Sequence, residues 1–79
     1  MKKEIYTQIM NFLEKELLNI VPLVATGKPV TKMYFEYHIT YEVVEQIDKH
    51  SLLGSDRKEI YDKVMKSIYE IAKQKGVVA

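Results

Sequence analysis

The chain has 79 residues, no cysteine and a formal net charge of +1. A chain of this length forms one small domain, which we expect to span residues 1–79 and to gain stability from dimerisation. The lack of cysteine excludes disulfides and thiolate metal sites, and the near-neutral charge indicates no strong overall attraction to nucleic acid or membranes.

No apolar run in the sequence reaches the length of a membrane span. The segment after Met-Lys-Lys is interrupted by Glu4, Gln8 and Asn11, unlike a signal peptide. These features predict a cytoplasmic protein with no membrane partner.

Residues 3–21 have the pattern of an amphipathic helix. Its apolar residues fall on two neighbouring stripes, the first formed by Ile5, Ile9, Phe12 and Ile20 and the second by Tyr6, Met10, Leu13 and Leu17. Two stripes are more than one neighbouring helix covers, so we expect this helix to pack on two surfaces or across a dimer interface. It is also where we expect a protein partner to bind. Pro22 ends the helix, and residues 25–29 form a turn.

Residues 32–40 predict a strand, because apolar and polar residues alternate there without a break. The alternation continues to residue 43, with Met33, Phe35, Tyr37, Ile39, Tyr41 and Val43 on one side and Lys32, Tyr34, Glu36, His38, Thr40 and Glu42 on the other. A helical alternative stays open, because Tyr34, Tyr37, Tyr41, Val44 and Ile47 are spaced three or four residues apart. In that case the protein is an all-α three-helix bundle.

A lone strand leaves its backbone N–H and C=O groups without partners, and the simplest partner is a second copy of the same strand. The fold class that we expect is therefore mainly α with one strand, which pairs in antiparallel orientation across a homodimer.

Two more helices are predicted after the strand. The first spans residues 41–50 with Thr40 as its N-cap, and the second spans residues 56–75. Asp56 and Glu59 have the spacing of a capping box at the start of the second helix, and Gly76 closes it.

This order of elements resembles the ribbon-helix-helix repressors, the Arc and MetJ-like superfamily. Residues 37–48, Tyr-His-Ile-Thr-Tyr-Glu-Val-Val-Glu-Gln-Ile-Asp, are similar to the family's strand and first helix, with Thr40 in the place of a proline. Residues 54–61, Gly-Ser-Asp-Arg-Lys-Glu-Ile-Tyr, are similar to the start of its second helix. The resemblance covers residues 32–75 and leaves the N-terminal helix outside.

The resemblance implies a sequence-specific transcriptional repressor that inserts the two-stranded ribbon into the major groove of double-stranded DNA. On this reading the ribbon presents Lys32, Tyr34, Glu36 and His38 to base edges. Arg57 and Lys58, at the start of the last helix, hold a phosphate through their free N–H groups, and Lys28 adds a backbone contact.

The sequence departs from the family at Glu36, because family ribbons rarely carry a carboxylate at the centre of the DNA-reading face, where it repels phosphate. A two-fold axis at residue 36 would also set Glu36 against its own copy, which is unfavourable. We therefore expect the axis at Tyr37 or at Phe35.

The sequence shows no spacing typical of a catalytic nucleophile with its base, and His38 and His50 lack the partners of a metal site. We expect no enzyme activity, no metal and no cofactor. A second function stays open: a small helical protein-interaction module, such as an adaptor, an inhibitor or an antitoxin-like protein, that does not bind nucleic acid. The near-neutral charge, Glu36 and the wide apolar face of the first helix favour it.

Overall fold

The computed structural model describes residues 2–21 and 27–79, which form helices, turns and one isolated β-bridge. The helices are α1 (Lys2–Lys15), α2 (Leu17–Ile20), α3 (Lys32–Lys49) and α4 (Gly54–Gln74). The predicted ribbon strand at residues 32–40 is wrong, because this whole segment lies in α3. The described residues agree with the all-helical alternative, a bundle of the three long helices α1, α3 and α4.

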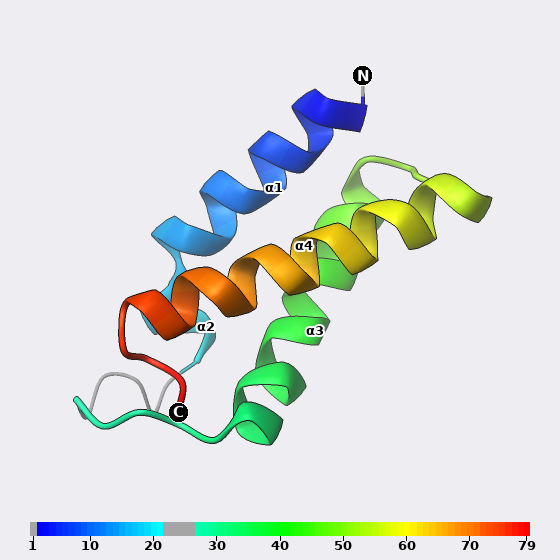
Figure 1. Ribbon diagram of the computed structural model, residues 1–79. Coiled ribbons are helices and arrows are strands. Elements are labelled where there is room, and N and C mark those ends of the chain that lie inside the picture. The colour runs from blue at the N-terminus through cyan, green and yellow to red at the C-terminus, as the bar shows by residue number, and fades with distance from the viewer. Residues whose placement is uncertain (1, 22–26) are drawn as a thin grey trace.

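The three long helices pack around one core (Figure 1). α1 and α4 run in the same direction, and α3 runs in the opposite direction. α1 contacts both α4 and α3, which explains why its apolar residues form two stripes. The predicted packing of the first helix on two surfaces is therefore confirmed, and both surfaces belong to the same chain.

α3 forms a helix because one side of it has a continuous apolar stripe. Phe35, Ile39, Val43 and Ile47 recur every four residues, and each is no more than 1% exposed. A helix also pairs its own backbone N–H and C=O groups, whereas a strand needs a second strand beside it. The burial of one side of α3 therefore favours a helix over the strand that the alternating pattern predicted.

The N-terminus of α3 is capped at Thr31. Its hydroxyl oxygen accepts a hydrogen bond from the backbone N–H of Tyr34, with a distance of 3.1 Å between the nitrogen and the oxygen. The predicted cap at Thr40 is wrong, because Thr40 lies in the middle of α3. The predicted end near residue 50 is close to the observed end, since α3 finishes at Lys49.

The predicted helix at residues 3–21 is present as two pieces, α1 and α2. They are separated at Glu16, whose φ of −99° and ψ of 11° depart from helical values. The Glu16 N–H donates to the Phe12 carbonyl at 3.0 Å, so the helical hydrogen-bond pattern of α1 extends to Glu16. The predicted helix end at Pro22 and the turn residues Ala25 and Thr26 lie outside the described residues.

α4 begins two residues earlier than predicted, after Leu53 as its N-cap. Gly54 has a φ of +60°, which residues with a Cβ rarely adopt. The predicted capping box is wrong, because Asp56 lies in the first turn of the helix and not at its N-cap.

The C-terminus of α4 closes at Gly76, as predicted. Gly76 has a φ of +74°, and its N–H donates to the Lys73 carbonyl at 3.0 Å. The Val77 N–H donates to the Ala72 carbonyl at 2.9 Å. These two bonds form a Schellman motif, which satisfies carbonyls at the end of the helix.

The last residues of the chain return to the segment before α3. Val30 and Val78 form a parallel β-bridge, in which the Val30 N–H donates to the Val77 carbonyl at 3.0 Å and the Ala79 N–H donates to the Val30 carbonyl at 2.8 Å. Both bridge residues are buried in the core. The bridge therefore closes one end of the bundle.

Replacing Phe35 with Ala should lower the free energy of unfolding by about 3–5 kcal/mol, because the change leaves a cavity in the core. The alternating pattern placed Met33 on the same strand face as Phe35, but in the structure Met33 is exposed. Met33→Ala should therefore cost less than about 0.5 kcal/mol in the unfolding of the monomer. Urea denaturation followed by circular dichroism measures both variants. Equal losses for the two would contradict the helical assignment of residues 32–40.

Replacing Thr31 with Ala should lower the free energy of unfolding by about 1 kcal/mol, because the Tyr34 N–H loses its acceptor. Thr31→Ser keeps the hydroxyl and is the matched control. Urea denaturation at one fixed protein concentration measures both variants, and an unchanged Thr31→Ala variant would show that the cap contributes nothing.

Candidate functional site

The side of α3 that faces away from the core exposes large apolar residues. Met33 is 82% exposed, Tyr37 62% and Tyr41 70%. These residues are four apart, as are the buried residues on the opposite side of the same helix, and half-buried Val44 continues their line. We call Met33, Tyr37, Tyr41 and Val44 the outer stripe of α3.

The two tyrosines of the outer stripe contact each other. The rings of Tyr37 and Tyr41 meet edge to face, with 5.9 Å between their centroids, and the His38 ring lies 5.1 Å from the Tyr37 ring. These contacts hold the aromatic side chains beside one another on the surface. The outer stripe therefore has two contacting tyrosine rings at its centre, and both tyrosines are largely exposed.

An open groove lies along the C-terminal half of the outer stripe. It has a volume of about 400 Å³ and is lined by Thr40, Tyr41, Val44, Glu45 and Asp48. The accessible surface of its lining is mostly apolar. Both carboxylates form ion pairs with neighbouring cations: Asp48 with Arg57, and Glu45 with Lys49, whose ammonium lies 3.8 Å from a Glu45 oxygen. The groove can receive an apolar side chain, such as one from a partner protein.

The structure separates the four residues that the ribbon reading placed on one DNA-reading face. Successive residues of a helix are rotated by about 100°, so Lys32 and Glu36 lie on one side of α3 and Tyr34 and His38 on another. The Lys32 ammonium lies 5.0 Å from the centroid of the Tyr69 ring of α4. The Tyr34 and His38 rings contact each other, with 4.4 Å between their centroids.

The remaining predicted DNA contacts are Arg57 and Lys58 of α4 and Lys28, which precedes α3. Arg57 pairs with Asp48, and the Lys58 ammonium lies 3.2 Å from an Asp62 oxygen. Since α4 begins at Gly54, the N–H of Lys58 falls within the helical hydrogen-bond pattern and is not free to hold a phosphate. Lys28 lies in the bend before α3 and is exposed.

DNA binding stays a prediction, but the ribbon on which it depended is helical, and so neither of the two expected ribbon registers at Tyr37 or Phe35 applies. The expected protein partner at the first helix also stays a prediction. The buried residues of α1, Ile9, Met10 and Leu13, belong to the common core.

The sequence contained the signal for the outer stripe, although the alternating pattern concealed it. Residues two apart in sequence lie on opposite sides of a helix, because two steps rotate by about 200°. The odd-numbered residues that predicted one buried strand face therefore divide into the outer stripe and the buried side of α3. The helical alternative also placed Tyr37 and Tyr41 on a face with Ile47, which is buried.

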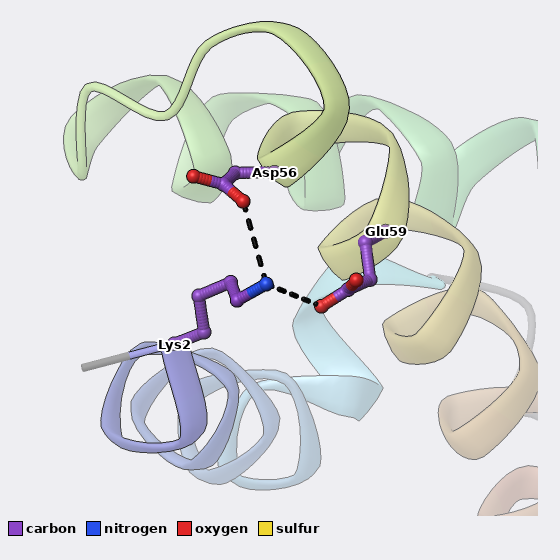
Figure 2. A network of polar contacts seen from close by, with 3 residues as sticks. All are labelled: Lys2, Asp56 and Glu59. Carbon is purple, nitrogen blue, oxygen red and sulfur yellow. Dashed lines mark ion pairs between the residues drawn. The ribbon is translucent and has the colours of Figure 1, made fainter.

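Asp56 and Glu59 of α4 bind the side chain of Lys2 from α1 (Figure 2). The Lys2 ammonium lies 2.9 Å from a Glu59 oxygen and 3.4 Å from an Asp56 oxygen. Hydrogen bonds and charge from Glu59, and then from Asp56, raise the pKa of Lys2 above its usual 10.5. The network joins the N-terminal ends of two parallel helices, and we assign it to the fold.

Residues 2–21 and 27–79 contain no group of three or more His, Asp or Glu side chains arranged to hold a metal ion. None of the helices in these ranges is both long enough and apolar enough to cross a membrane.

The chain matches no protein-family model, and comparisons with curated proteins and with solved structures found no match.

Replacing Lys2 with Gln should slightly lower the melting temperature at low ionic strength, and high salt should remove the difference because exposed ion pairs are screened. Lys3→Gln is the matched control, since no ion pair of Lys3 occurs in the described part of the chain. Thermal unfolding at low and high salt measures both variants.

The stabilisation that the Lys2 ion pairs contribute to the fold decreases at high pH. Because the pKa of Lys2 is raised in the folded state, the stabilisation is fully present below pH 10.5 and is lost as the pH rises through the raised pKa. A Lys2→Gln difference that grew at higher pH would contradict this assignment.

Proposed function

We propose that this chain is a small helical protein-interaction module, of the adaptor, inhibitor or antitoxin-like kind, which binds its partner through the outer stripe of α3. One observation carries the proposal. Although α3 buries Phe35, Ile39 and Val43 completely in the core, it leaves three large apolar residues exposed in one line on its other side: Met33, Tyr37 and Tyr41.

Burial of the outer stripe would supply substantial binding energy. An aromatic side chain buries roughly 150–250 Å². At about 25 cal/mol per Å² of apolar surface, two tyrosines and a methionine contribute on the order of 10 kcal/mol before the costs of association. Tyrosine is enriched in protein interfaces because its ring is apolar and its hydroxyl group forms hydrogen bonds at the rim.

The charges around the outer stripe support a protein partner over a nucleic acid. The formal net charge is only +1, and none of the four stripe residues is charged. Two of the cations expected to contact DNA, Arg57 and Lys58, are paired with Asp48 and Asp62. A DNA-binding surface usually presents cations that phosphates can reach, because phosphate contacts dominate the affinity.

The proposal is tested by photo-crosslinking in cells that naturally produce the protein. Tyr37→p-benzoylphenylalanine places the reactive group on the outer stripe, and Asn11→p-benzoylphenylalanine places it on an exposed position of α1 as a control. We expect irradiation to join the Tyr37 variant, and not the Asn11 variant, to one discrete protein that mass spectrometry identifies.

Crosslinks to DNA alone from position 37 would overturn the proposal in favour of the DNA-binding prediction. The absence of any protein crosslink from position 37, in a variant with unchanged circular dichroism, would also overturn it.

A further inference from the structure

We propose, on the basis of the function proposed above, that the partner of the outer stripe is a second copy of this chain. The two copies dock α3 against α3 in antiparallel orientation, related by a two-fold axis that crosses the helix near the level of Ile39. The order of side chains, the distribution of charge and the area of the surface support this arrangement.

The order of residues along the outer stripe is nearly the same in both directions. Met33, Tyr37, Tyr41 and Val44 read as apolar, tyrosine, tyrosine, apolar, and the two tyrosines are equally distant from residue 39. A two-fold axis at that level places Tyr37 of one copy beside Tyr41 of the other, and Met33 within one residue of the level of Val44. The surface is therefore self-complementary, as a two-fold interface requires.

The centre of this interface contains no charge. Thr40 borders the outer stripe near the axis, and the four stripe residues are uncharged. Like charges therefore do not meet at the centre when the same surface of two copies is brought together. Burial of unpaired charge is the usual cost of self-association, and it is avoided here.

The two ends of α3 differ in charge, which favours the antiparallel orientation. Asp48 continues the line of the outer stripe at its C-terminal end, seven residues after Tyr41. The first turn of α3 has no acidic residue and begins with Lys32. Asp48 is paired with Arg57 of its own chain, so the ends of the helices contribute most to the preference. Antiparallel docking places the positive N-terminal end of each α3 beside the negative C-terminal end of the other, whereas parallel docking places like ends together.

The exposed area is consistent with a weak, reversible dimer. Met33, Tyr37 and Tyr41 from two copies contribute on the order of 1,000 Å² of buried surface, and their neighbours add to it. Stable interfaces begin at about 1,200 Å² in total, so this surface lies near the lower end of that range. We expect dissociation in the micromolar range.

Sedimentation equilibrium of the full chain, from low micromolar to several hundred micromolar concentration, tests the dimer. We expect the apparent mass to rise from one to two chains. Tyr37→Glu places a carboxylate in each half of the interface and should raise the dissociation constant at least about 100-fold. Leu18→Glu is the matched control, since Leu18 is an exposed apolar residue of α2 outside the outer stripe, and its dissociation constant should not change.

A monomer at every concentration would overturn the inference, as would a dimer that Leu18→Glu dissociates and Tyr37→Glu does not. Circular dichroism of each variant shows whether it is folded. Tyr37 and Leu18 are both exposed, so neither change should unfold the chain.

Disulfide formation between introduced cysteines tests the orientation of the two α3 helices. The chain has no cysteine of its own, so no other disulfide can form. A disulfide needs Cα atoms within about 7 Å. In the antiparallel dimer the two copies of residue 33 are about 18 Å apart along the axis, at 1.5 Å per residue. We expect a mixture of Met33→Cys and Val44→Cys proteins to form a mixed disulfide, and neither protein alone to form one. Rapid disulfide formation by Met33→Cys alone would show a parallel dimer.

The two proposals fail in different ways. A monomeric chain whose position 37 crosslinks to a different protein overturns the second copy as partner and leaves the interaction module standing. A monomeric chain without any protein crosslink at position 37 overturns both.

Discussion

The packing of α3 against both α1 and α4 is the constraint on which the rest of the structure depends. Phe35, Ile39, Val43 and Ile47 form one apolar line along the inner side of α3, and they join residues of the other two long helices in one core. Their burial sets the rotation of α3 about its own axis. That rotation in turn determines which residues face away, and it leaves the outer stripe exposed. The candidate site is thus a direct consequence of core packing.

Contacts at both ends of the bundle support this arrangement. At one end, the bridge between Val30 and Val78 joins the segment before α3 to the end of the chain. At the other end, Lys2 of α1 binds Asp56 and Glu59 of α4. The first contact is buried and the second is exposed, so the bridge contributes more to holding the helices together than the ion pairs do. Neither contact involves the outer stripe, which stays exposed in the closed bundle.

The core residues and the surface residues of α3 therefore have separate physical roles. Changes on the inner side alter the free energy of unfolding, because they leave cavities in a close-packed interior. Changes on the outer side should leave the free energy of unfolding nearly unchanged, because Tyr37 and Tyr41 are largely exposed to solvent. The outer stripe can therefore be altered while the fold is kept.

Local features of the sequence determined much of the fold. The helical period of the first and last helices and the stop at Gly76 follow from neighbouring residues, and the structure contains them.

The segment from Met33 to Val43 could not be assigned in this way, because apolar residues at every second position also form two lines with a spacing of four. In a helix, one of these lines faces the core and the other faces solvent. In a strand, both lines lie on the same face. The local sequence therefore permits a helix or a strand. Only the tertiary structure decided between them, because α1 and α4 offer an apolar surface for one line of α3 and no second strand is present in the described residues to pair with it. The same packing decided that Met33, Tyr37 and Tyr41 are exposed.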